Sequence, residues 1–277
     1  MTSSEIEQLS QQSDDAVDLG RGALLVARLE YPDLDPTGVL LRLDAMAGRI
    51  RESISPGARV AERLAAINHY LFEEQGFKGN REEFYDPRNS CLNAVLERRL
   101  GIPISLSVLY MEIGRRLGVE AEGVSFPGHF LVRVSLEFGV IVLDPYNEGV
   151  TLSEEDVRER LAQQTGVEFA ESADLADILQ PAGKKEIIAR MVRNLKRIYS
   201  EAGATEKAIK AATLILAVQP DAHSELRDRG LLYRRIEAYR AALADLSNYL
   251  EKEPEAHDAD ALRVLVIELQ GINDRLN

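Results

Sequence analysis

The sequence predicts an α+β fold in which helices come first, a small antiparallel sheet follows and an all-α repeat ends the chain. The first observation is helical spacing of apolar residues near the N-terminus, such as Val60, Leu64, Ile67 and Leu71. The second is a change of period after Gly118, where short β-rich runs follow one another. The third is a 34-residue internal repeat in the last third of the chain. A chain of 277 residues is long enough for more than one domain.

Composition narrows the class of protein. The net charge of -13 repels phosphate backbones, so we expect no nucleic-acid partner. No apolar run approaches the roughly 20 residues that span a bilayer, so we expect no membrane partner. The only cysteine, Cys91, has no partner for an internal disulfide, and the polar N-terminus MTSSEIEQLSQQSDDAVDLG lacks the apolar region of a signal peptide. These features predict a cytoplasmic protein.

Residues 1 to about 84 are predicted to form helices with short polar breaks. The break YPDLDP ends one helix, and Asp35 and Pro36 suit the cap and the first turn of the next. The tract GFKGNREEFYDP closes this part. Asn89 and Ser90 then favour a helix start, and a short helix is predicted from Cys91 to Leu100. A second helix follows over residues 104–117, ended by a glycine.

The strands come next, in the runs GVSF, HFLVRV and FGVIVLD. The last two are predicted to form a hairpin with its turn centred near residues 137–138. Antiparallel pairing about that turn sets His129 opposite about residue 146. Asp144 then lies at a cross-strand or diagonal position relative to His129. The hairpin alone therefore predicts that these two side chains are close.

The C-terminal part begins after a loop and a helix capped by Ser153. The acidic stretch of residues 166–183 is interpreted as a linker, which gives domains at residues 1–165 and 184–277. Within the second domain the same residue types recur 34 positions apart, as Tyr199, Ala208 and Pro220 and again as Tyr233, Ala242 and Pro254. This spacing resembles the tetratricopeptide repeat, which has two antiparallel helices per unit. A final helix over about 258–276 is expected to cover the open end.

The stretch from about Leu24 to Leu161 resembles the transglutaminase-like domain of the bacterial SirB-type regulator family. The matching strings are YPDLD, YDPRNS, LNAVLERRLGIPISLSVLYMEIGRRLG, FPGHFLVR and LDPYN, together with LRDRGLLY in the C-terminal part. In that family such a domain is followed by tetratricopeptide-like helices. The resemblance implies a fold related to the papain-like cysteine enzymes, whose active members use a cysteine, a histidine and an aspartate.

The resemblance makes Cys91, His129 and Asp144 the candidate catalytic triad. His129 follows a glycine and Asp144 precedes a proline, as in the family. Cys91 departs from the pattern, because active members carry their cysteine at the start of the helix directly before the strands. That helix begins here with Ser105 and Ser107 in place of a thiol, and the tryptophan that often follows the histidine is absent.

Two interpretations of these residues stay open. A thiol at a helix N-terminus has a lowered pKa, His129 would take its proton, and Asp144 would orient the imidazole. Alternatively, Cys91 is a small core residue and His129 a structural histidine bonded to Asp144. The sequence has no GxGxxG after a strand, no GxxxxGK[ST], no HExxH and no CxxC, so we expect no cofactor and no metal.

Two functions follow from these interpretations. The first is a protein that acts through contacts with a protein or peptide partner, in regulation as the family name suggests, and retains only a vestigial Cys-His-Asp site. The second is a cysteine-dependent hydrolase or acyltransferase that acts on a peptide or amide bond. The sequence favours the first narrowly, because of the position of Cys91.

Overall fold

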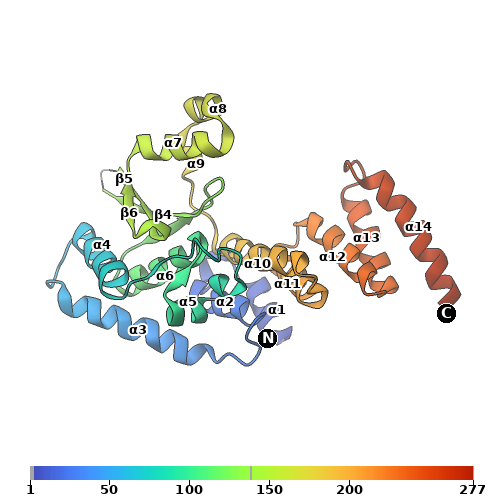
Figure 1. Cartoon of the computed structure of the whole chain (residues 1–277), viewed down its shortest axis with the longest axis horizontal. Helices are drawn as coiled ribbons and strands as arrows, with labels where there is room; N and C mark the ends of the chain where they lie inside the picture. The colour runs from blue at the N-terminus through green and yellow to red at the C-terminus, as the bar shows by residue number, and fades with distance from the viewer. Residues whose placement is uncertain (1–2, 138, 277) are drawn as a thin grey trace. The chain divides into compact units, whose positions relative to one another are not determined.

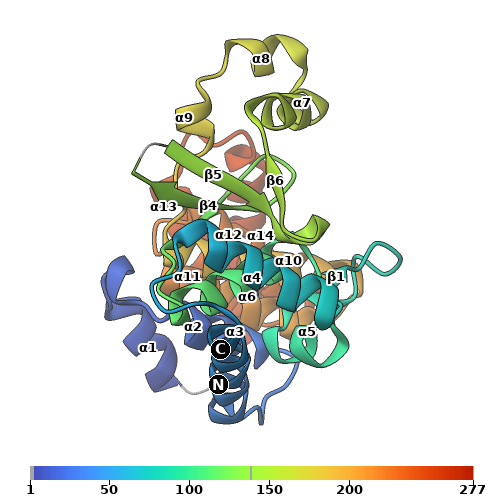
Figure 2. The same cartoon turned by 90° about the vertical axis from the view of Figure 1, so that its left-hand side faces the viewer.

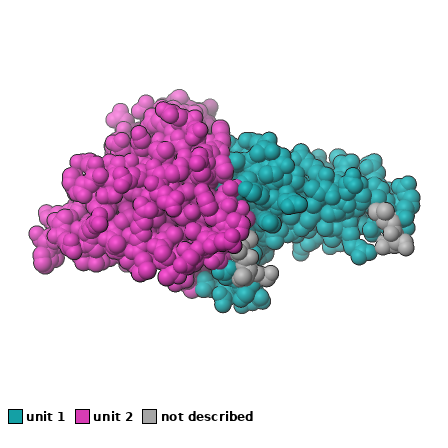
Figure 3. All heavy atoms as spheres, turned by 60° about the horizontal axis from the view of Figure 1, so that its bottom comes forward, with its two compact units in different colours: residues 1–13, 188–277 teal, residues 14–187 magenta. Residues whose placement is uncertain are grey.

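The computed structural model describes residues 3–137 and 139–276 (Figure 1). The chain divides into two compact units, one of residues 14–187 and one that combines residues 1–13 with residues 188–277 (Figure 3). The first unit is mixed and the second is helical. The predicted order of N-terminal helices, antiparallel sheet and helical repeat is confirmed, and each unit is described by itself below.

The unit of residues 14–187 is built from helices and short strands. Its helices are α2 (Leu19–Ala27), α3 (Pro36–Ser53), α4 (Val60–Asn68), α5 (Leu92–Arg98), α6 (Pro103–Arg116), α7 (Glu154–Thr165), α8 (Val167–Ser172) and α9 (Leu175–Ile178). Its strands are β1 (Lys78–Gly79), β2 (Leu100–Gly101), β3 (Ala121–Val124), β4 (Leu131–Leu136), β5 (Gly139–Asp144) and β6 (Val150–Leu152). Single turns of 3-10 helix occupy Asp14–Ala16, Pro87–Ser90 and Pro145–Asn147, and a π-helix over His69–Glu74 continues α4.

The main sheet has the order β3-β4-β5-β6, with every neighbouring pair antiparallel. In the predicted hairpin, Val132 pairs with Leu143 and Leu136 with Gly139, which is the register that a turn at 137–138 requires. Residue 138 itself lies outside the described residues. Figure 2 shows this sheet with α7, α8 and α9 on one side and α6 on the other. With this register β5 ends at Asp144, and the chain leaves the strand there.

Helix α6 forms the centre of this unit. Pro103 occupies its first turn, where a missing N–H costs nothing, and the Ser105 hydroxyl accepts a hydrogen bond from the Ile102 N–H at 3.0 Å. Twelve successive residues of the helix, from Pro103 to Gly114, are buried. A helix that is buried on all sides in this way belongs to the interior of a domain. It packs against α2, α3, α4 and α5 as well as β3 and β4.

Residues 166–183, interpreted from the sequence as a linker, contain α8 and α9. Apolar residues of this stretch, including Ala170, Leu175 and Leu179, pack against the sheet residues Val142 and Leu152. The Arg158 guanidinium on α7 donates to the Ala170 carbonyl at 2.9 Å. In the structure this stretch therefore covers one face of the sheet.

The helical unit consists of α1 (Ser3–Gln11), the part of α10 (Lys184–Glu201) from residue 188 onward, α11 (Thr205–Val218), α12 (His223–Arg235), α13 (Tyr239–Lys252) and α14 (Ala259–Leu276). Successive helices pack in pairs, α11 on α12, α12 on α13 and α13 on α14. Gly230 permits the approach of α12 and α13, because an added Cβ would lie 2.8 Å from Leu246. Across the described residues, we find no helix with the length and apolarity needed to cross a membrane.

Candidate functional site

His129 lies in the turn that leads into β4. Its backbone N–H donates to the Phe126 carbonyl at 3.1 Å, and Gly128 before it has a φ of +66°. A side chain at Gly128 would be strained at that φ and would collide with Gln164. The imidazole is 19% exposed. The glycine therefore lets the turn pass close to α7 and brings the His129 ring to the surface.

Asp144 ends β5, and its side chain is completely buried. Its Oδ1 lies 3.0 Å from His129 Nε2 and accepts hydrogen bonds from the backbone N–H groups of Tyr146 and Asn147 at 3.1 and 3.3 Å. Its Oδ2 accepts from Asn147 Nδ2 at 2.6 Å and from the Arg160 guanidinium. The proximity of His129 and Asp144 that the hairpin predicts is confirmed.

The environment of Asp144 keeps its carboxyl ionised. Burial raises its pKa, but hydrogen bonds and charge from His129, with further hydrogen bonds from Asn147 and Arg160, lower it more, to about 2. A carboxylate can only accept, so the proton between the two side chains belongs to His129 Nε2. His129 and Asp144 are therefore arranged as a general base and the carboxylate that orients it.

The His129 ring opens onto a pocket of about 570 Å³, which we call the His129 pocket. Polar side chains supply most of its lining, namely Arg81, Tyr146, Asn147, Asp156, Glu159, Arg160, Gln163 and Gln164, with residues 126–128. The Tyr146 ring meets the His129 ring edge to face, with centroids 5.8 Å apart. Arg81 lies over the Tyr146 ring, 5.9 Å from its centroid, and donates to Asn147 Oδ1 at 2.5 Å.

A second set of hydrogen bonds, which involves Asn68 and Tyr110, holds the loop that follows Asp144. Asn68 Nδ2 donates to the Gly149 carbonyl at 2.9 Å, and the Tyr110 hydroxyl donates to Asn68 Oδ1 at 2.9 Å. Tyr110 lies on α6 and is itself buried. The loop that carries Tyr146 is therefore anchored to the central helix.

Cys91 stands at the N-cap of α5 and is completely buried. It packs in a small cluster with Ala27 and Ala94, against which Tyr31 and Leu34 also pack. Its thiol donates to the Pro87 carbonyl at 3.5 Å. Cys91 does not line the His129 pocket in the described chain. The structure thus brings together two of the three candidate residues around this pocket.

The start of α6, where active family members carry their cysteine, holds buried hydroxyls. Ser105 Oγ donates to the Asn89 carbonyl at 2.6 Å, and Asn80 Nδ2 donates to Asn89 Oδ1 at 3.0 Å. Ser107 is buried too, and its hydroxyl has no hydrogen-bond partner within the part of the chain that the structure describes. In the described residues we find no cluster of three or more His, Cys, Asp or Glu side chains suited to a metal ion.

Sequence reasoning missed the contribution of α7. Asp156, Glu159, Arg160, Gln163 and Gln164 reach the His129 pocket from one face of that helix, at the spacing i, i+3, i+4, i+7 and i+8. That polar stripe is visible in the sequence after the cap at 153. Nothing in the sequence predicts that this stripe faces His129, because the direction of α7 depends on how the chain leaves β6.

Comparisons with known proteins agree with this architecture. The family described as the transglutaminase-like superfamily matches residues 37–193, and the tetratricopeptide repeat matches residues 195–266. A UPF0162 protein of Xylella fastidiosa is 41% identical over 268 residues, which are 97% of this chain and 95% of the relative. Protein SirB1 of Salmonella typhimurium is 28% identical over 249 residues, 88% of this chain and 90% of that protein. F-box only protein 21 of Mus musculus is 33% identical over 169 residues, 57% of this chain but 26% of that protein. No solved structure matches the chain.

Proposed function

Because the chain belongs to the transglutaminase-like superfamily, in its SirB-type branch, and carries tetratricopeptide repeats, we propose that it acts mainly through protein contacts in a regulatory role. In this proposal His129 and Asp144 are what is retained of a cysteine-enzyme site, and Cys91 is a core residue. We propose that it does so in the cytoplasm, because a chain with one cysteine forms no internal disulfide and so needs no oxidising compartment.

The burial of Cys91 is the observation that carries the proposal. A nucleophilic thiol must be reached by its substrate and must be stabilised as a thiolate. Cys91 instead has no exposed surface and packs against Ala27 and Ala94, so a substrate does not reach its thiol in the folded chain. The ring of His129 opens onto a pocket that Cys91 does not line in the described chain.

The His129 pocket has the properties of a prearranged binding surface. Asp144 accepts hydrogen bonds from side chains of the β4 turn, its own loop and α7, so it fixes the walls of the pocket relative to one another. Phe84 and Tyr85, which are 39% and 57% exposed, continue the aromatic surface of Tyr146 through edge contacts. Aromatic side chains and arginine are enriched where protein interfaces bind most strongly, and Arg81 lies on this surface as well.

The repeats supply a second reason to expect a protein partner. Tetratricopeptide helices stack into extended surfaces that other chains contact. On the last helix, α14, Val264 and Ile267 are 60% and 67% exposed although both are apolar. They lie three residues apart in the helix, so the two side chains are neighbours on its surface.

The alternative function is a cysteine-dependent hydrolase or acyltransferase acting on a peptide or amide bond. The observation that favours it is the His129 Nε2 to Asp144 Oδ1 distance of 3.0 Å, the geometry of a general base held by its orienting carboxylate. The proposal and this alternative differ in what they require of the thiol, because only the alternative needs Cys91 as an accessible thiolate.

Alkylation of Cys91 by iodoacetamide in the native full chain separates the two functions. We expect the native rate to be at least about a hundredfold below that of the chain in urea, since a buried thiol reacts only when the structure opens. The alkylation rate should rise with pH as that of a model thiol does. It should be the same in His129→Ala when urea is added so that the two proteins have equal stability. Fast alkylation well below pH 8.5 that is lost in His129→Ala would establish the nucleophile and exclude the proposal.

A further inference from the structure

The last helix of the helical unit, α14, occupies the position of the first helix of a third repeat. Helix α13 begins and ends 34 residues after α11, at Tyr239 and Lys252 against Thr205 and Val218. The same step carries α12 onto residues 257–269, which overlap α14. Three residue types recur at this step, in the pairs His223 and His257, Arg229 and Arg263, and Leu231 and Leu265. Because each repeat has two antiparallel helices, α14 corresponds to the first helix of a repeat.

In the second repeat, α13 covers one face of α12. Gly230 on α12 faces α13, because an added Cβ would lie 2.8 Å from Leu246. Tyr233, three residues further on, packs against the apolar cluster that contains Leu246. The Arg229 guanidinium donates to both carboxylate oxygens of Asp245 on α13, at 2.7 and 2.8 Å. Gly230 and Tyr233 therefore mark the face of α12 that α13 covers.

The first repeat uses the equivalent position in the same way. Tyr199 on α10 lies 34 residues before Tyr233 and is only 3% exposed. The Lys207 ammonium on α11 lies 5.4 Å from the centre of the Tyr199 ring. In both repeats, then, the second helix covers this position of the first helix.

On α14 the corresponding face is open. A further step of 34 residues leads from Gly230 to Val264 and from Tyr233 to Ile267, which are 60% and 67% exposed. Figure 1 shows α13 between α12 and α14. The exposure of both side chains shows that no helix of the described chain covers them as α13 covers α12. We call the surface of α14 that carries Val264 and Ile267 the α14 face.

We propose that the α14 face binds an amphipathic helix of a partner protein, which completes the third repeat as α13 completes the second. The repeat itself identifies this occupant, because in both earlier repeats a helix covers the equivalent position. A second copy of the chain does not offer such a helix, since Ala242 and Leu246 of α13 are completely buried in their own repeat. The inference rests on the proposed action through protein contacts and specifies the kind of partner.

The α14 face also indicates which residue the partner helix presents to it. On α12 the missing side chain of Gly230 leaves room for Leu246. On α14 the side chain of Val264 fills that room, so the partner helix needs a small residue such as alanine at the position of Leu246. Removal of the exposed surface of Val264 and Ile267 from water then favours binding.

The probe is a blocked peptide of residues 239–252, the sequence of α13, with Leu246→Ala as the small residue. A lactam bridge between exposed positions 240 and 244 holds the peptide helical, since a free peptide of this length is marginally helical. Asn248→Trp, at another exposed position, supplies a fluorescence signal that the chain lacks, because the chain has no tryptophan.

Binding is measured as tryptophan anisotropy while the full chain is added up to about 0.5 mM. We expect a saturable rise with a dissociation constant near about 0.1 mM. A bridged peptide of the same composition, in which apolar residues no longer recur at helical spacing, should give no saturable rise.

Two matched pairs of substitutions locate the binding site. Val264→Ser with Ile267→Ser removes the apolar side chains of the α14 face and should weaken binding at least about tenfold. Leu41→Ser with Val167→Ser removes two apolar side chains of similar exposure from the other unit and should change the affinity by less than about twofold. Circular dichroism spectra check that both variants keep the fold.

Absence of a saturable rise, or equal weakening by both pairs of substitutions, would overturn the inference. Self-association of the full chain over the same concentrations, seen by sedimentation velocity and lost with Val264→Ser and Ile267→Ser, would overturn it in favour of a second copy. Neither outcome affects the alkylation test of Cys91, so the inference can fail while the proposed function stands.

Discussion

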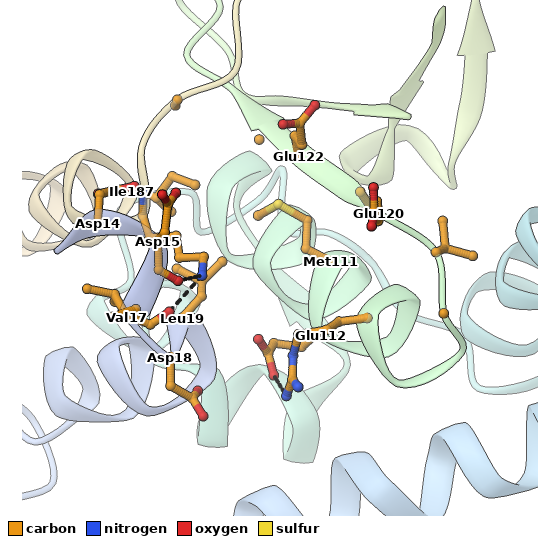
Figure 4. A pocket seen from close by; sticks show the side chains of 18 residues that line it. Asp14, Asp15, Val17, Asp18, Leu19, Met111, Glu112, Glu120, Glu122 and Ile187 are labelled. Atoms are coloured by element: carbon orange, nitrogen blue, oxygen red, sulfur yellow. Dashed lines mark hydrogen bonds and ion pairs between the residues drawn. The ribbon is translucent and has the colours of Figure 1, made fainter. Parts of the chain in front are cut away.

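The unit of residues 14–187 contains two pockets whose carboxylates differ in burial and in hydrogen bonding. In the His129 pocket, Asp144 is completely buried and receives hydrogen bonds from His129, Asn147 and Arg160. In a second pocket of the same unit, of about 660 Å³ (Figure 4), Asp15 and Glu120 are exposed and, in the described chain, no hydrogen bond or ion pair engages either carboxylate. Asp144 links several parts of the structure, whereas Asp15 and Glu120 contribute little to the stability of the fold. A buried carboxylate with several hydrogen bonds marks a place where the stability of the fold depends on a charge, and an exposed carboxylate does not.

The largest effect expected from this comparison is on Asp144. Asp144→Ala removes a buried acceptor and leaves His129, Asn147 and the Arg160 guanidinium without it, so the free energy of unfolding should fall by about 3 kcal/mol. Urea unfolding followed by circular dichroism measures the loss. Glu159→Ala, on the rim of the same pocket, should cost less than about 0.5 kcal/mol. Equal losses in the two variants would show that Asp144 is not a structural centre.

The pH dependence of stability provides an intermediate effect. The pKa of Asp144 is about 2 in the folded chain and is near 3.8 in an unfolded one. Between these values the unfolded state binds a proton that the native state does not, so stability falls as the pH falls from about 5 towards 2. The wild type should lose about 2 kcal/mol more over this range than Asp144→Ala. Parallel pH profiles of the two proteins would mean that the hydrogen bonds to Asp144 do not lower its pKa.

The sequence predicted those parts of the site that depend on neighbours along the chain. A hairpin with a two-residue turn is enough to bring Asp144 to His129, because strand register follows from the turn. The burial of Cys91 could not be predicted in the same way. Its position at a helix start is a local feature, but its burial depends on how α2 packs against α5. Arg160 was missed for a similar reason, since the direction of α7 is decided by tertiary packing.

The second pocket could not be predicted from the sequence either, although its charged residues are visible there. It joins residues 14–19 to residues 111–123 and 182–187, and no local pattern predicts that these three stretches meet. Residues 166–183 illustrate the same limit. Their acidic composition is typical of a linker, yet Ala170, Leu175 and Leu179 supply enough apolar surface to cover the sheet. Composition reports the average of a stretch, whereas packing uses the few residues on one face.

The smallest expected effect distinguishes two neighbouring residues of the second pocket. Asp14 accepts hydrogen bonds from the backbone N–H groups of Lys184 and Lys185, both at 2.8 Å, and so caps the start of α10. Asp14→Ala should therefore cost about 1 kcal/mol of unfolding free energy. Asp15→Ala should change it by less than about 0.5 kcal/mol, because the Asp15 carboxylate has no partner in the described chain and Lys184 binds only its backbone carbonyl. Thermal and urea unfolding of both variants measure the difference. A loss at Asp15 as large as that at Asp14 would show that the fold itself uses the Asp15 charge.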